Sequence, residues 1–290
     1  MSFSGLFSIG LSGLSAFSSG LEAVSSNIAN SQTNGYKRVQ TQFADLIPAD
    51  AASLSTAVGA GVIGTGVSAA ARHLAGEQGA VTRTNTPTNA AVAGDGFFVV
   101  SDQPASSGST PLLFTRAGDF APDALGNLVS SSGYYLQGAR VGTAGRSGFG
   151  GLQSLETVNI NLTPAGADPV ALGQLTGVVI DADGVVNATY ANGETHALFR
   201  IPLALFVNPE GLEGAERTAF RNTTLSGAPR LSAARSGSAG AIEGSAVEIS
   251  TVDIGQEFST LISTQRAYST ASRIISTADE LWRTLVQTAA

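Results

Sequence analysis

The sequence predicts an α+β fold in which long N- and C-terminal helices pair as a coiled coil, with a discontinuous all-β middle domain and an extended arm. Three observations support this prediction. Apolar residues recur at every seventh position near both termini, strand-like runs separated by turn residues fill the middle, and a stretch rich in Ala, Gly, Ser and Thr follows the first helix. The two ends must therefore meet again after the chain has passed through the β-domain.

The C-terminal segment, residues 252–290, has the longest periodic pattern. Asp253 is placed to cap its first turn, with Gln256 three residues later. No proline follows, and no glycine after Gly255, so we expect a helix roughly 50 Å long at 1.5 Å per residue. Its heptad stripe, one half of a predicted assembly seam, consists of Ile254, Leu261, Tyr268, Ile275 and Trp282.

The N-terminal segment, residues 1–34, has a matching pattern. Its helix should end near Asn30, because Thr33, Asn34 and Gly35 favour the conformations on which helices stop. The other half of the assembly seam consists of Phe7, Leu14, Leu21 and Ile28. A helix packed on its own β-domain would also need an apolar stripe. A seam this long exceeds a compact β-domain, however, so pairing and assembly are favoured.

The middle of the chain divides into three predicted parts. Residues 35–79 are weakly periodic and are expected to form the extended arm. Residues 80–141 and 175–251 should form the β-domain, with hairpin turns at Asp123–Gly126 and Asp181–Gly184, and with loops over residues 209–247. Residues 142–174 are richer in Gly, Ser and Pro and are expected to be a short insertion.

The composition excludes several classes of protein. Charged residues make up 13% of the 290 residues, against about 25% in an average soluble domain, so much of the surface is neutral and suited to contact with other copies. A net charge of −7 without a basic stripe argues against nucleic acid. The N-terminus has no Lys or Arg before Lys37, which predicts neither a cleaved Sec signal nor membrane insertion, and there is no cysteine.

The sequence predicts no enzyme, no cofactor and no metal site. His73 and His196 lie in different segments without a nucleophile signature, so structural roles are favoured. The loop after Asp181 has Val186 and Asn192 where a calcium-binding EF-hand needs Gly and Glu. The glycines between residues 142 and 151 lack the Lys-Ser/Thr of a phosphate-binding loop.

Several short motifs resemble those of the bacterial flagellar rod and hook proteins. Ser26–Asn30 and Thr33–Lys37 resemble the N-terminal signature of that family, and Val252-Asp253 with Thr264–Tyr268 resemble its terminal helix. Further matches are Gly94–Phe98, Phe114–Phe120, Gly126–Val129, Asn208–Leu212 and Ser226–Pro229. The residues that carry the two terminal motifs are Asn27, Asn30, Thr33, Gly35, Tyr36, Gln265 and Arg266.

The resemblance implies a subunit of a tubular axial polymer, with the paired helices as an inner layer around an export channel and the β-domain as an outer layer. Met1–Ser4 and Phe43–Leu46 resemble hook proteins, which form a flexible joint; a proximal or distal rod protein is the alternative. The implied partners are copies of the chain, adjacent rod and hook-filament junction proteins, a hook cap and the flagellar type III export apparatus. The implied location is extracellular, in the flagellar hook or basal body.

Two functions from other classes can be compared with this one. An extracellular β-rich binding module, such as an adhesin, could use the glycine-rich insertion, but it would leave the terminal seams unexplained. A hydrolase would need a constellation of catalytic residues, which the sequence does not show. The sequence therefore favours a structural subunit without catalysis.

Overall fold

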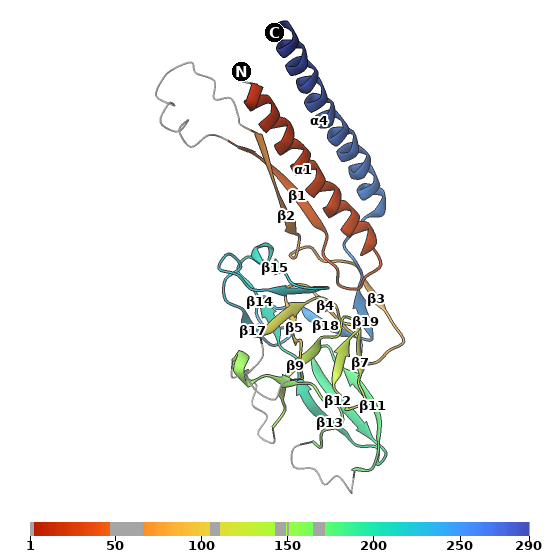
Figure 1. The fold of residues 1–290 in the computed structure, drawn as a ribbon. Coiled ribbons are helices and arrows are strands. Elements are labelled where there is room, and N and C mark those ends of the chain that lie inside the picture. Colours follow the sequence, from red (N-terminus) through yellow and green to blue (C-terminus); the bar gives the residue numbers. More distant parts are fainter. Residues whose placement is uncertain are drawn as a thin grey trace. The chain divides into compact units, whose positions relative to one another are not determined.

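The computed structural model describes residues 3–46, 66–104, 111–142, 149, 151–164 and 172–289. The chain divides into two compact units, each built from separate stretches of sequence. Unit 1 comprises residues 1–31, 39–72 and 252–290, and unit 2 comprises residues 32–38 and 73–251. Helices at both ends and a β-rich middle confirm the predicted mixed fold (Figure 1).

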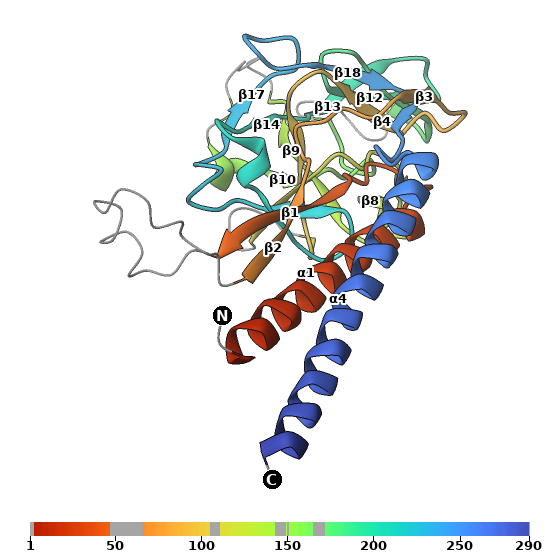
Figure 2. The same ribbon diagram turned by 90° about the horizontal axis from the view of Figure 1, so that it is seen from above.

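Unit 1 consists of two long helices and a β-ribbon. Helix α1 (Phe3–Ala29) has 27 residues and α4 (Ile254–Ala289) has 36. Strands β1 (Val39–Leu46) and β2 (Gly66–His73) form a two-stranded sheet. Figures 1 and 2 show α1 and α4 side by side, with both chain ends at the same end of the pair. No helix in the described part of the chain is long and apolar enough to cross a membrane.

The predicted helix ends agree with the structure. The amide of Asn30 donates to the Ser26 carbonyl, 3.0 Å away, and α1 stops one residue earlier. At the start of α4, the Gln256 amide donates to the Asp253 carboxylate at 3.0 Å, which is the predicted N-cap. These local signals fix where each helix begins and ends.

Unit 2 contains the remaining strands. Its largest sheet runs in the order β11-β12-β13-β9-β5-β6-β16-β15, and two further sheets pair β18 with β4 and β19 with β3. The strands are β3 (Val81–Arg83), β4 (Ala90–Ala93), β5 (Phe97–Ser101), β6 (Leu112–Thr115), β7 (Phe120–Pro122), β8 (Leu128–Ser130), β9 (Tyr135–Arg140), β10 (Glu156–Thr157), β11 (Leu175–Ile180), β12 (Val185–Tyr190), β13 (Thr195–Arg200), β14 (Leu203–Leu205), β15 (Glu213–Gly214), β16 (Ala219–Arg221), β17 (Arg230–Ser232), β18 (Ala241–Gly244) and β19 (Ala246–Glu248).

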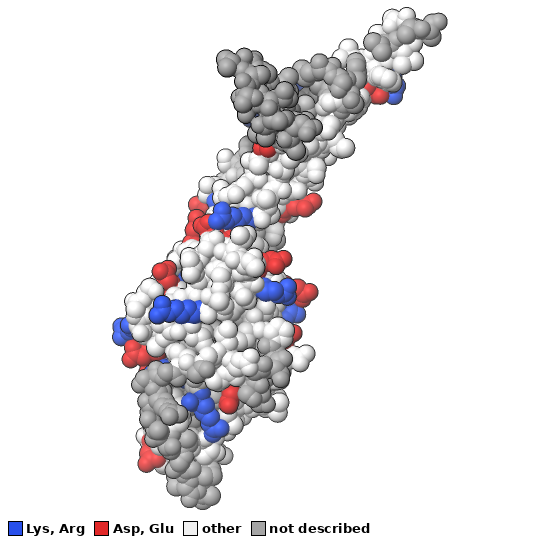
Figure 3. Space-filling model, turned by 90° about the vertical axis from the view of Figure 1, so that its left-hand side faces the viewer, with Lys and Arg blue, Asp and Glu red and all other residues white. Residues whose placement is uncertain are grey.

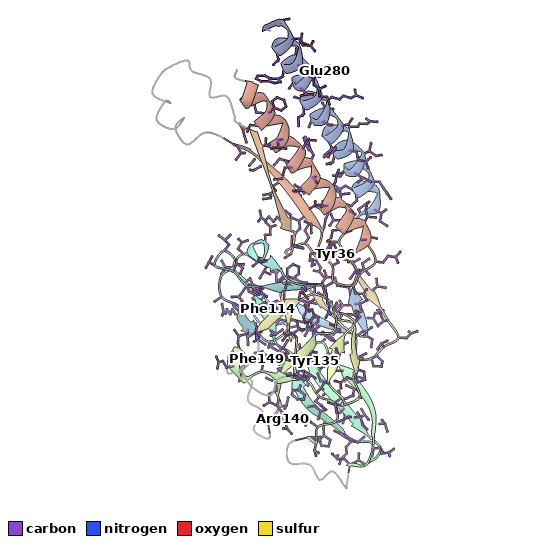
Figure 4. All side chains as sticks on the ribbon, in the orientation of Figure 1. Tyr36, Phe114, Tyr135, Arg140, Phe149 and Glu280 are labelled. Carbon is purple, nitrogen blue, oxygen red and sulfur yellow. The ribbon has the colours of Figure 1, made fainter. Side chains whose placement is uncertain are left out.

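The core of unit 2 is closely packed around phenylalanines. Strand β5 is buried on both faces: Phe98 contacts Phe120 edge-on at 5.5 Å between ring centroids, while Phe97 faces Phe206 at 5.8 Å. Phe114, labelled in Figure 4, packs on the same Phe206 ring at 4.8 Å. Two apolar clusters, one containing Phe98 and the other Phe97, thus give this unit a core of its own.

The predicted hairpin turns are confirmed. The Asp123 carboxylate accepts from the amides of Leu125 and Asn127, both at 2.8 Å. Asp181 accepts in the same way from the amides of Asp183 and Val185, and Gly184 has a φ of 75°. The aspartates therefore satisfy turn amides.

The prediction of loops over residues 209–247 is only partly right, because short strands interrupt the irregular backbone there. Strands β15 to β18 and part of β19 lie there, each two to four residues long. Strands this short contain too few residues to show an alternating pattern, so only their partners in other segments define them.

The predicted arm and insertion lie partly outside the described residues. Within 35–79, residues 39–46 and 66–73 are the extended strands β1 and β2. Within 142–174, the described residues include the short helix η1 (Leu152–Ser154) and β10, and they bury Leu155 and Val158. Residues 47–65, 143–148, 150 and 165–171, among them most of the glycines considered for a phosphate loop, lie outside the described part.

Candidate assembly surfaces

In unit 1, α1 and α4 pack antiparallel through small residues. A Cβ placed on Gly13 would lie 3.8 Å from the Ala271 Cβ, and one on Gly20 would lie 3.3 Å from the Thr264 methyl. Small residues allow the two helix backbones to approach closely. Most of the buried positions among the described residues of α1 therefore carry little or no side chain, namely Gly10, Gly13, Ala16, Gly20 and Ala23, and the remaining two are Val24 and Asn27.

The predicted seam of α1 lies beside this buried face. Phe7, Leu14, Leu21 and Ile28 are all half-buried, each next to or near one of the small residues. The β-ribbon also covers part of α1, because Phe17 contacts Phe43 of β1 at 5.7 Å between ring centroids, and the Val67 amide donates to the Ser12 hydroxyl at 3.2 Å. Helix α1 is thus covered by α4 and by the ribbon.

The five residues of the predicted α4 seam differ in their burial. Leu261 and Ile275 are half-buried, and Ile275 lies where a side chain on Gly10 would have to go. Ile254, Tyr268 and Trp282 are exposed in the single chain. Among the α4 side chains that the structure describes, the buried apolar ones are Ala271 and Ala278.

Besides the exposed seam residues, further large apolar side chains of α4 are exposed. We call the whole set the α4 apolar surface. Its members are between 40% and 54% exposed: Ile254, Phe258, Ile262, Tyr268, Ile274, Leu281, Trp282 and Val286. Ile254, Phe258 and Ile262 are spaced by four residues and so lie along one face of the helix. Eight large apolar side chains on one helix exceed the scattered exposure that is normal for a soluble surface.

Asn27 of the N-terminal motif joins α1 to the ribbon. Its side-chain amide donates to the Val39 carbonyl, and its side-chain oxygen accepts from the Val39 amide, both at 2.8 Å. The residue is 1% exposed. An asparagine here replaces the partner strand that the first residue of β1 would otherwise need. Asn30 instead bonds back to the Ser26 carbonyl at 2.9 Å.

The rest of the N-terminal motif belongs to unit 2. There residues 35–38 run beside residues 248–251, and we call these two stretches the root segments. The Gly35 amide donates to the Glu248 carbonyl at 2.7 Å, and the Thr251 amide donates to the carbonyl of Tyr36 at 3.1 Å (Figure 4 labels Tyr36). Gly35 has a φ of 68°, and a side chain on it would collide with the backbone of Ala117, so only glycine fits.

The buried side chains of the two root segments include Lys37 and Glu248, which meet Arg116. We call these three ionic side chains the ion cluster. One Glu248 oxygen accepts from the Lys37 ammonium and, at 2.8 Å, from the Gly79 amide; the other lies 3.3 Å from the Arg116 guanidinium. Lys37 and Glu248 side chains are fully buried and that of Arg116 is 3% exposed. Arg116 also stacks on the Phe97 ring at 4.9 Å.

Burial lowers the pKa of Lys37, and the Glu248 carboxylate partly opposes that shift. The pKa of Arg116 is lowered for the same reason. The Lys37 ammonium has a second acceptor in the Glu77 carbonyl. The cluster therefore combines two buried cations with one carboxylate. The carboxylate and the carbonyls of Glu77 and Val92 accept from the two cations, whereas Arg116 Nε is buried without a hydrogen-bond partner.

The sequence interpretation missed the ion cluster. Lys37 was considered only as the first basic residue and as part of a motif, Arg116 only as part of a motif, and Glu248 was given no role. Lys37 is the only lysine in the sequence, and it lies in the signature motif, which is the signal that could have drawn attention to it. Its partner, 211 positions later, follows from no sequence pattern. Gln265 and Arg266 of the C-terminal motif lie exposed on α4, and Thr33 is half-buried.

Neither the histidines nor the cleft of unit 2 forms a catalytic arrangement. His73 packs edge-on against Phe220 at 5.5 Å, and burial lowers its pKa. His196 lies 3.1 Å from the Glu194 carboxylate on a hairpin. A cleft of about 220 Å³ lies between residues 160–164 and 172–175, and among its described lining residues Tyr190 is the one ionisable group. In the described residues, no three His, Cys, Asp or Glu side chains are grouped to hold a metal.

Three family descriptions match separate parts of the chain. Residues 7–37 match the description "Flagella basal body rod protein". Residues 91–188 match "Flagellar hook protein FlgE/F/G D1 domain", and residues 242–288 match "Flagellar basal body rod FlgEFG protein C-terminal". The first match includes residues 35–37 of one root segment, the third includes the other root segment, and the second includes Arg116.

Curated relatives carry two different names. The chain is 32% identical to the flagellar basal-body rod protein FlgG of Agrobacterium fabrum over 283 residues, 94% of this chain and 95% of that protein. It is 28% identical to the flagellar hook protein FlgE of Brucella suis over 409 aligned positions, 99% of each chain. A 132-residue alignment to the hook protein FlgE of Caulobacter vibrioides reaches 44% identity but covers 46% of this chain and 21% of that protein. Together with a β-rich middle between N- and C-terminal helices in the sequence, these matches show that the chain belongs to the bacterial flagellar hook and basal-body rod protein family.

Proposed function

We propose that the chain is a structural subunit of the flagellar hook, which polymerises into a tube that encloses the export channel and transmits torque from the motor to the filament. The observation that carries polymerisation is the α4 apolar surface, with its eight large side chains that remain exposed in the single chain. In a tube, neighbouring copies would cover it.

The unequal lengths of the helices support this proposal. Helix α4 has 36 residues and α1 has 27, so one α1 cannot cover α4 over its whole length. At about 25 cal/mol per Å² of buried apolar area, covering α4 by neighbouring helices would stabilise each contact by several kcal/mol. The seam residues Phe7, Leu14, Leu21 and Ile28, with Ile254, Leu261, Tyr268, Ile275 and Trp282, are the proposed contacts of a coiled-coil inner layer, and unit 2 forms the outer layer.

The placement in the hook rests on the Caulobacter hook protein, whose 44% identity over 132 residues is the highest among the relatives described above. In that position, the partners would be further copies, the rod, the hook-filament junction and the hook cap. Export would use the flagellar type III apparatus without a Sec signal.

A rod protein is the second candidate, and alignment length favours it. The Agrobacterium rod protein aligns over 283 positions, close to the 290 residues of this chain. The Brucella hook protein needs 409 positions, so the alignment contains more than a hundred positions that this chain leaves empty. A hook built from this chain would then lack the extra mass of the Brucella protein, and a rod built from it would be a stiff shaft.

The test of polymerisation uses charges on the α4 apolar surface. In the double variant Phe258→Asp/Ile262→Asp, both substituted side chains are exposed in the single chain, so the urea midpoint of the monomer should stay unchanged. Burial of two unpaired carboxylates between copies should abolish tubes in electron microscopy and pelleting assays. The matched control, Ser259→Asp/Ser263→Asp, places the same charges at exposed serines of α4. Normal tubes from the Phe258/Ile262 variant would refute this surface as the assembly contact.

A further inference from the structure

The chain passes between its two units four times, and the root segments lie beside these crossings. The crossings fall after residues 31, 38, 72 and 251. Within unit 2, the Arg38 amide donates to the Thr251 hydroxyl at 2.9 Å, and the Leu74 amide donates to the Arg38 carbonyl at 2.9 Å. Gly35 is bound to Glu248 as described above. Gly35, Arg38, Leu74 and the root segment 248–251, which stand at or within a few residues of the four crossings, are therefore hydrogen-bonded to one another inside unit 2.

The ion cluster lies directly against these hydrogen bonds. Lys37 and Glu248 belong one to each root segment, and Arg116 extends from the end of β6 to the same carboxylate. Glu248 also accepts from the Gly79 amide. A single carboxylate thus connects both root segments, the stretch after β2 and the largest sheet.

Buried ionic groups contribute in a particular way. Removal of three charges from water offsets most of the attraction between them, so well-packed apolar side chains often give equal or greater stability. Ion pairs and hydrogen bonds are directional, however, whereas apolar contacts allow side chains to slide. A buried cluster with little net stability can therefore still fix the geometry of the segments that it connects.

We propose that Lys37, Arg116 and Glu248 form a clamp that fixes the chain segments at the four crossings relative to the largest β-sheet. The role of this clamp is to make the crossings stiff, and not to stabilise unit 2. The inference rests on the proposed function, because a subunit that transmits torque must carry force through these segments. Flexible segments at the crossings would deform under torque within each subunit, whereas segments held by the clamp would transmit the torque to the next subunit.

The experiment compares two substitutions of the ion cluster in the full chain. The triple variant Lys37→Met/Arg116→Met/Glu248→Met replaces the charges by apolar side chains of similar length. We expect its urea midpoint to stay close to that of the wild type, and hydrogen exchange at the Gly35, Leu74 and Thr251 amides to become at least tenfold faster. Exchange at Phe98 and Phe199, in the core of unit 2, should not change. Arg235→Met, which breaks an exposed ion pair with Asp183, is the matched control.

The second variant, Glu248→Gln, leaves two buried cations without their carboxylate, and it should lower the urea midpoint of unit 2 as a whole. Unchanged exchange at the root segments in the triple variant would overturn the clamp, because apolar packing would then hold them equally well. A triple variant that unfolds would also overturn it, since the cluster would then act through stability. A Glu248→Gln variant with an unchanged midpoint would show that the buried charges do not depend on one another, and the clamp would be withdrawn.

The exchange measurements use the monomer, so they remain informative if the chain forms no tubes. In tubes of the triple variant, we expect a shorter persistence length in electron micrographs at a normal tube diameter. Failure of the proposed function appears separately, as wild-type chains that do not polymerise. Failure of the clamp appears as tubes of the triple variant with wild-type stiffness.

Discussion

At the scale of single residues, Asn27 shows how one polar side chain can organise a helix end. It forms two hydrogen bonds with the backbone of Val39 and is 1% exposed. Replacement by leucine would leave a buried N–H and a buried C=O without partners, at about 1–3 kcal/mol each. We expect Asn27→Leu to lower the free energy of unfolding by about 2–4 kcal/mol in urea titrations.

Hydrogen exchange at the Val39 amide provides the local readout of that variant, and it should become much faster. Asn30→Leu is the matched control, because the Asn30 side chain bonds within an exposed turn at the end of the same helix. Equal losses of stability in the two variants would contradict the role assigned to Asn27.

The same residues show what sequence reasoning could and could not predict. The motif Asn27 to Lys37 was identified from its residues, but its parts belong to two different units of the structure. Asn27 binds the ribbon, Gly35 passes close to Ala117, and Lys37 enters the ion cluster. Roles that depend on partners 80 or 200 positions away do not follow from local spacing.

At the scale of elements, the predictions succeeded where the signal is repeated many times. The long helices have several heptads and defined ends, and local periodicity determined them. Strands of two to four residues after Gly211 have no such repetition. Strand β15 pairs with the neighbouring β16, while β16, β17 and β18 are determined by pairing with β6, β14 and β4. The predicted apolar seam is only half-buried on α1, because glycines and alanines occupy the face nearest α4.

The close approach of α1 to α4 predicts that a pair of cysteines introduced there will form a disulfide. The sequence has no cysteine, so introduced pairs report on distance alone. A Cβ on Gly13 would lie 3.8 Å from that of Ala271, which is the usual Cβ separation in a disulfide. We expect Gly13→Cys/Ala271→Cys to crosslink rapidly under mild oxidation, with a faster band on non-reducing gels.

The control pair for the crosslink is Leu11→Cys/Ala271→Cys. Leu11 is 65% exposed on α1, so its thiol should point away from α4 and crosslink slowly. Equal crosslinking of both pairs would indicate that α1 rotates freely against α4. In that event, the small-residue contact would not define how the helices pair.

At the scale of the whole molecule, the low content of charged residues and the exposed apolar side chains of α4 both indicate a chain that associates with other subunits. Charged residues make up 13% of the chain, and Figure 3 shows wide uncharged areas between single blue and red side chains on the face that it presents. Neutral surfaces bring a low desolvation cost when copies associate. A chain of this composition is therefore suited to being surrounded by other subunits.

Immunogold labelling of an epitope tag inserted in an exposed turn would locate the chain along the flagellum. The β12–β13 turn at Asn192-Gly193 is exposed, and Gly193 has a φ of 87°, so a short tag inserted there disturbs no strand pairing. We expect immunogold particles along the curved hook of isolated hook and basal-body particles. The same tag inserted at Gly237, another exposed turn, serves as an independent copy. Gold confined to the straight shaft with both tags would make the chain a rod protein, and the flexible-joint role would then be replaced by that of a stiff shaft.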